Sequence, residues 1–170
     1  WFGRKLGLPY NHRRAVRLIF NTRQRFMLYF DSQQPNNDTL SQYYPTDAKG
    51  HLYKIEDWFE FDDAGAGFDI ITATLQNFTT TGGAKKPARY RWNFRPRAGH
   101  GSLNDFTDLF TLVDAVNAPS PEPYTSATFS VMDAEEWMRH FALQHTVGNW
   151  DTYGYRRGKN CFGYKPDQGP

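Results

Sequence analysis

The sequence predicts a single α+β domain with a substantial core, and three observations support that fold class. The chain has 170 residues, the length of one domain. Aromatic residues make up 17% of it, far more than a disordered chain carries. Short apolar stretches typical of strands come first, and two longer stretches with helical spacing follow. We therefore expect strands mainly in the first half and helices in the second.

The N-terminal part predicts a helix end followed by a β-hairpin. Residues 1–8 have helical spacing and then reach a Gly and a Pro, which are typical of a helix stop. Two β-prone stretches, 15–20 and 25–30, flank a polar turn over 21–24. This hairpin pattern breaks at Asp31.

The middle of the chain predicts shorter elements. Residues 40–44 indicate a short helix, and residues 51–55 a strand. Gly65 and Gly67 indicate a loop. Aromatic and basic residues alternate over 89–95 with period two. That pattern predicts an extended segment with three aromatics on one face and arginines on the other.

Two amphipathic helices are predicted in the second half. The first runs over 104–117, and its apolar stripe consists of Phe106, Leu109, Phe110, Val113 and Val116. A proline-rich linker follows over 119–123. The second helix begins with the capping box of Asp133 and Glu136 and ends at Gly148. Its predicted buried face is Trp137, Met138, Phe141, Ala142 and His145. A strand is expected over 160–165.

Composition excludes several kinds of protein. The single cysteine, Cys161, excludes an internal disulfide framework and a cysteine-based metal site. No apolar run approaches the roughly 20 residues that a membrane span requires. The histidines have no metal-ligand spacing. The formal net charge of +2 hides alternating basic and acidic blocks, which either compensate on the surface or line a cleft for an anion.

The basic and aromatic stretch at 85–97 raises the question of nucleic acid. Nucleic acid requires stacking rings and cations on the same surface, whereas the alternation puts them on opposite faces. We therefore expect no nucleic-acid binding, although the arginine face suits an acidic or phosphorylated partner. Lys54 lies close to acidic residues, and a structural ion pair is its simplest interpretation.

The loop between the last helix and the last strand carries the strongest chemical signal. It contains Asn149, Asp151, Lys159 and Asn160. An Asp placed after a helix can orient or deprotonate a hydroxyl, and an Asn before the next strand can hold a metal ion on phosphate oxygens. Protein kinases use this order of residues. The alternative is that Asp151 and Asn149 only cap a turn.

Four stretches of the sequence resemble the CotH kinase family, the spore-coat-type atypical protein kinases. They are Leu6-Gly7-Leu8-Pro9 with Val16-Arg17-Leu18-Ile19-Phe20-Asn21, Leu28-Tyr29-Phe30-Asp31-Ser32-Gln33-Gln34-Pro35-Asn36, Gly50-His51-Leu52-Tyr53-Lys54, and Gly148-Asn149-Trp150-Asp151 with Gly158-Lys159-Asn160. The resemblance covers nearly the whole chain, and the last stretch is its most specific part.

This resemblance implies an atypical protein-kinase-like fold with a partial N-lobe hairpin and a mostly helical C-lobe. Residues 1–31 would be the end of the N-lobe and the hinge, and 32–170 the C-lobe. It also implies phosphorylation of protein Ser or Thr hydroxyls with ATP and Mg²⁺ or Mn²⁺. Asp151 would be the catalytic aspartate and Asn160 a metal ligand. The ATP contacts would be Tyr29, Phe30 and Asp31. Asn149, Lys54 and Lys159 would be supporting residues of the site.

The family pattern is not fully met. Thr22 and Phe26 stand where glycines are usual, and Phe30 stands where an acid is common. The Asp-x-Asp metal motif is expected just after residue 170 and the phosphate-binding loop before residue 1. We therefore expect a fragment, truncated at both ends, that is inactive in phosphotransfer alone.

Two other functions stay open at this point. A kinase-like scaffold would bind nucleotide or a partner without transfer, and an extracytoplasmic structural or carbohydrate-associated module would use surface aromatics. The sequence leaves the compartment open, with an extracytoplasmic, secreted or spore-surface location in a bacterium compatible with the resemblance.

Overall fold

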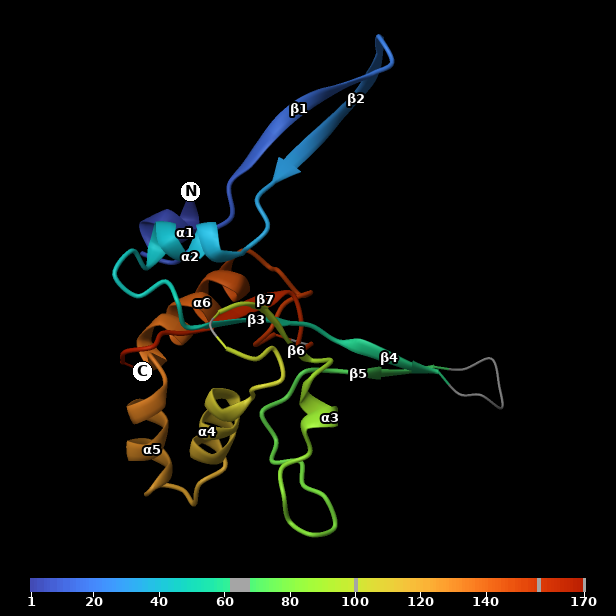
Figure 1. The fold of residues 1–170 in the computed structure, drawn as a ribbon. Helices are drawn as coiled ribbons and strands as arrows, with labels where there is room; N and C mark the ends of the chain where they lie inside the picture. Colours follow the sequence, from blue (N-terminus) through green and yellow to red (C-terminus); the bar gives the residue numbers. More distant parts are fainter. Residues whose placement is uncertain (62–67, 100, 156, 170) are drawn as a thin grey trace.

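The computed structural model describes residues 1–61, 68–99, 101–155 and 157–169 (Figure 1). It contains helices and antiparallel strands in largely separate segments, which confirms a mixed α and β architecture. The helices are α1 (Phe2–Lys5), α2 (Asn37–Tyr43), α3 (Pro87–Tyr90), α4 (Thr107–Val116), α5 (Tyr124–Val131) and α6 (Ala134–Thr146). The strands are β1 (Arg13–Phe20), β2 (Arg23–Ser32), β3 (His51–Ile55), β4 (Trp58–Phe61), β5 (Phe68–Ile71), β6 (Phe94–Ala98) and β7 (Cys161–Lys165).

A three-stranded antiparallel sheet lies at the centre of the molecule, in the order β6-β3-β7. Side chains of a strand alternate between the two faces of its sheet, so β3 contributes to two apolar clusters. Tyr53 and Ile55 pack with α4, through Leu109 and Val113, in the larger cluster. Leu52 packs on the other face with α2 in a smaller cluster.

The strand predicted over 51–55 is confirmed, and so is the N-terminal hairpin. β1 and β2 are longer than expected, since β1 begins at Arg13 and β2 runs from Arg23 to Ser32. The turn between them holds only two residues, Asn21 and Thr22. Both have positive φ, 48° and 62°, which is the geometry that a two-residue hairpin turn requires. The hairpin projects away from the body of the molecule (Figure 1).

The extended segment predicted around Tyr90 is wrong. Tyr90 ends α3 and its ring is buried, whereas Trp92 is 47% exposed in the turn before β6. Pro87 stands in the first turn of α3, where its fixed φ favours a helix start. The Tyr90 hydroxyl accepts from the backbone N–H of Phe78 at 2.8 Å and donates to the carbonyl of Gln76 at 2.6 Å. These tertiary bonds outweigh the local alternation.

The buried face predicted for α6 is also wrong. None of its residues is fully buried, Met138 is 63% exposed, and His145 is exposed instead of lying in a core. The helix reaches the core through Trp137 and Phe141, whose rings contact Tyr153. Its start is as predicted, since the Asp133 carboxylate accepts the N–H of Glu136 at 2.9 Å.

The proline-rich linker predicted over 119–123 lies between α4 and α5. It leads directly into α5, which the sequence did not predict because that stretch has no apolar stripe. The helix predicted over 104–117 is confirmed as α4, with Phe106, Leu109 and Val113 buried. The loop expected at Gly65 and Gly67 lies outside the described residues.

Candidate active site

The candidate site is the segment that joins α6 to β7, residues 147–160. Val147 caps the helix, and Gly148 then turns the chain with φ 66°. Asn160 precedes β7 with φ 54°, a left-handed conformation that Asn tolerates better than most residues. Both ends of the segment are thus sharp turns, and we call it the 147–160 loop.

Within the loop, Asp151 is held on both of its carboxylate oxygens. The Asn160 side-chain amide donates to Asp151 Oδ2 at 2.9 Å and to the Asp151 backbone carbonyl at 2.7 Å. Lys159 Nζ lies 2.8 Å from Asp151 Oδ1, an ion pair whose angles fall outside a hydrogen bond. Three of the residues singled out from the sequence thus form one cluster.

Glycine is required where the loop packs against the segment after β5. The backbone N–H of Ala73 donates to the carbonyl of Gly158 at 3.1 Å. A Cβ on Gly158 would lie only 1.9 Å from the Ala73 carbonyl oxygen. Any side chain would separate the two backbones, so this contact fixes the loop next to Lys159.

Of the two acidic residues after β3, Asp57 faces the loop, and the sequence did not indicate its place beside the site. Asp57 Oδ2 lies 3.6 Å from an Arg157 guanidinium nitrogen and 3.7 Å from Lys159 Nζ. Glu56 pairs with Lys54 at 2.6 Å and with Arg95 at 2.5 Å. The ion pair expected at Lys54 is therefore confirmed. The acidic pair after the predicted strand was the available signal.

A buried side-chain amide holds the backbone of Glu56, the first residue of this acidic pair. Asn93 is completely buried, and its side-chain amide donates to the carbonyls of Glu56 and Ile71, each at 2.9 Å. These bonds join the residue that follows β3 to the last residue of β5. No local signal indicates this role, because the alternation over 89–95 predicts that Asn93 stands in an extended segment.

Asn149 does not join the Asp151 cluster. Its side-chain amide donates to Gln144 Oε1 at 2.7 Å, and its backbone N–H donates to the Gln144 carbonyl at 2.9 Å. These contacts tie it to the end of α6. The turn-capping interpretation therefore suits Asn149 better than a catalytic one.

The predicted ATP contacts lie elsewhere in the molecule. Tyr29, Phe30 and Asp31 are in β2, on the projecting hairpin (Figure 1). Phe30 is exposed, and the Asp31 carboxylate pairs with Arg14 at 2.8 Å. The structure thus does not bring these residues together with Asp151.

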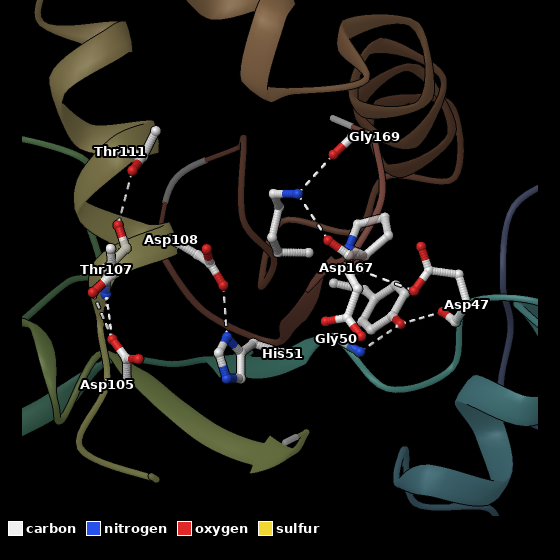
Figure 2. Close-up of polar contacts among 12 residues, drawn as sticks. Asp47, Gly50, His51, Asp105, Thr107, Asp108, Thr111, Asp167 and Gly169 are labelled. Carbon is white, nitrogen blue, oxygen red and sulfur yellow. Dashed lines mark hydrogen bonds and ion pairs between the residues drawn. The ribbon is translucent and has the colours of Figure 1, made fainter. Parts of the chain in front are cut away.

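Polar contacts also fix the chain where it leaves β7. Figure 2 shows the Asp47 carboxylate accepting the backbone N–H of Asp167 at 3.0 Å, and it also accepts that of Gln168 at 2.9 Å. Nearby, His51 Nδ1 lies 2.6 Å from Asp108 Oδ2 at the start of α4. These contacts set the direction of the C-terminal residues.

The ability of the described residues to hold a metal ion depends on which side-chain oxygens and nitrogens lie together. No group of three His, Cys, Asp or Glu side chains suited to a metal occurs among them. Asn160 commits its NH₂ to two acceptors on Asp151, so its Oδ1 is the oxygen available to a hard cation. Helices long and apolar enough to cross a membrane are also absent from the described part of the chain.

Comparison with known proteins gives one match. The family described as CotH kinase protein matches residues 2–170, essentially the whole chain. Searches of curated proteins and of solved structures found no match. The match spans the projecting hairpin and the 147–160 loop with its Asp151 cluster. This chain therefore belongs to the CotH kinase protein family.

Proposed function

We propose that the chain carries the catalytic loop of a kinase that transfers phosphate from ATP to Ser or Thr hydroxyls of a protein. The observation that carries the proposal is the Asp151 carboxylate, fixed from two sides by Lys159 and Asn160. Membership of the family supports a kinase-like function. Residues 1–31 would form the end of the N-lobe and the hinge, and residues 32–170 would form the C-lobe.

In this proposal Asp151 orients the acceptor hydroxyl and accepts its proton. Such a positioned base contributes about 10²–10⁴-fold to a rate. The Asp151 side chain is 36% exposed, and because its Oδ1 is buried, a substrate hydroxyl would approach Oδ2. Lys159 and Asn160 reduce the side-chain entropy that Asp151 would otherwise lose when it engages the hydroxyl.

Asn160 is the proposed metal ligand. Mg²⁺ prefers oxygen ligands and is usually bound through one or two carboxylates together with phosphate oxygens. The Asn160 amide oxygen fits that donor set, and at least one carboxylate from outside the described residues must complete it. Bound ATP and Mg²⁺ would supply the phosphoryl group and neutralise its charge. The backbone of Tyr29, Phe30 and Asp31 is the proposed adenine contact.

Two measurements on the full-length protein test this function. ATP with Mg²⁺ should raise the melting temperature, and radiolabelled phosphate should transfer to protein. Asp151→Ala should abolish transfer and leave the fold intact, whereas Glu135→Ala, on the exposed side of α6, should have no effect. Full transfer by the Asp151 variant would refute the assignment.

A kinase-like scaffold without transfer is the second candidate. It is favoured by the state of Asp151, since both of its oxygens already contact Lys159 or Asn160. The same experiment separates the two: ATP would raise the melting temperature, and no labelled product would form. If ATP causes no shift in the melting temperature, the remaining candidate is a binding module that uses surface aromatics such as Trp92.

A further inference from the structure

Asp57 lies against the 147–160 loop but has no part in the reaction proposed above. It follows β3 by two residues, and its side chain is only 10% exposed. Its Oδ2 has no hydrogen-bond partner in the described part of the chain. A carboxylate removed from water without hydrogen bonds is costly, so neighbouring cations must offset its charge.

Two cations from the same loop meet this requirement. The Arg157 guanidinium lies 3.6 Å from Asp57 Oδ2, and Lys159 Nζ lies 3.7 Å from the same oxygen. The Lys159 side chain is 18% exposed and that of Arg157 is 37% exposed. Lys159 is therefore the less solvated of the two and depends more on its anionic neighbours.

The Lys159 ammonium is shared between two carboxylates. It lies 2.8 Å from Asp151 Oδ1 as well as 3.7 Å from Asp57 Oδ2. Lysine has a long flexible stem and a point charge, so one contact alone leaves its position poorly defined. A second anion behind the ammonium restricts it to the space between Asp57 and Asp151.

We propose that Asp57 is a positioning residue, which holds the Lys159 ammonium against Asp151 and so fixes the orientation of that carboxylate. The catalytic consequence rests on the function proposed above, whereas the contact itself does not. Asp57 touches no substrate in this arrangement. It acts through Lys159, from the short segment that joins β3 of the central sheet to β4.

Other contacts keep the loop folded, so the effect of Asp57 on Lys159 can be isolated. Gly158 fixes the backbone on Ala73, and Asn160 bonds Asp151 without Asp57. Arg157 is the matched control, because it contacts the same Asp57 oxygen and the structure records no ion pair between it and Asp151. Removing Arg157 tests the general charge balance, and removing the Asp57 charge tests the position of Lys159.

Nuclear magnetic resonance of the lysine ammonium groups is the direct test. In the wild-type protein, the Lys159 ammonium protons should exchange slowly with water and show Overhauser contacts to the Asp57 methylene. Asp57→Asn keeps the shape of the side chain and removes its charge, and we expect exchange to accelerate about tenfold. Arg157→Gln should change the rate less than twofold.

Radiolabel transfer by the full-length protein gives the second readout. Asp57→Asn should lower kcat about tenfold with little change in KM for ATP. Asp57→Glu, which keeps the charge, should retain most of the wild-type kcat. Wild-type protein that shows the Lys159 contacts but no transfer would refute the kinase function and leave the positioning role standing. Unchanged Lys159 exchange in Asp57→Asn would overturn the positioning role. If that variant does not fold, absence of the wild-type Overhauser contacts would overturn it instead.

Discussion

Replacing Gly158 with Ala should dislodge the 147–160 loop from the segment after β5. The added Cβ would lie 1.9 Å from the Ala73 carbonyl oxygen and 2.7 Å from the Ala73 nitrogen. Contacts of this kind below 3.0 Å essentially never occur, so the two backbones must separate by at least 1.1 Å, the difference between 3.0 and 1.9 Å. Backbone atoms oppose the methyl here, so no flexible side chain can rotate away.

The cost in stability has two parts. Overpacking of a well-filled site typically costs about 1–3 kcal/mol. The separation also breaks the bond from the Ala73 N–H to the Gly158 carbonyl, and a lost hydrogen bond costs about 1 kcal/mol. We expect the free energy of unfolding to fall by about 2–4 kcal/mol. For a chain of this size the melting temperature would fall by roughly 4–16 °C.

Urea unfolding followed by tryptophan fluorescence measures this change. Gly82→Ala is the matched control, since its Cβ would meet only the Thr80 hydroxyl, at 3.9 Å. The control should change the free energy of unfolding by less than about 0.5 kcal/mol. If Gly158→Ala is as stable as Gly82→Ala, the close approach of the two backbones is not real and the position of the loop must be revised.

Three further results should follow. Asn93→Ala should lower the free energy of unfolding by about 2–4 kcal/mol in urea denaturation, because it leaves the buried carbonyls of Glu56 and Ile71 without a donor. Burial raises the pKa of the Cys161 thiol to about 12, so iodoacetamide at pH 8 should label this thiol only after unfolding. The free energy of unfolding should also fall as the pH rises above 9.0, the usual pKa of a thiol, because the thiol then ionises in the unfolded chain alone. Burial lowers the pKa of His140, so as the pH falls this side chain is protonated in the unfolded chain before it is protonated in the folded one. The free energy of unfolding should therefore fall as the pH drops through 6.5, and thermal melts of His140→Gln should lack that fall.

Elements with strong local signals were predictable from the sequence. The hairpin was visible in two β-prone stretches around a polar turn, and β3 was predicted with its observed bounds. The apolar stripe of α4 predicted the helix and the burial of Phe106, Leu109 and Val113. The pairing of Asp151 with Lys159 and Asn160 fits the interpretation of the loop, since the three residues lie within ten positions of one another.

What the sequence could not show depends on contacts between distant segments. The Tyr90 hydroxyl is held by the 76–78 segment, which local alternation cannot reveal. The exposure of Met138 follows from where α6 meets Tyr153, not from its own periodicity. Asp57 is more than ninety positions before Asp151, so its relation to the site required the folded chain.

The end of β3 organises the candidate site because two adjacent acids there serve different partners. Glu56 gathers Lys54 and Arg95 on the central sheet, and Asp57 faces the 147–160 loop. The Asn93 amide holds the Glu56 carbonyl, so the backbone that carries both acids is fixed from the core. A loop on the surface is free to move, whereas a buried anchor is not. The proposed positioning of Asp151 therefore depends on the segment after β3, through Asp57, as well as on Lys159 and Asn160 of the loop that carries it.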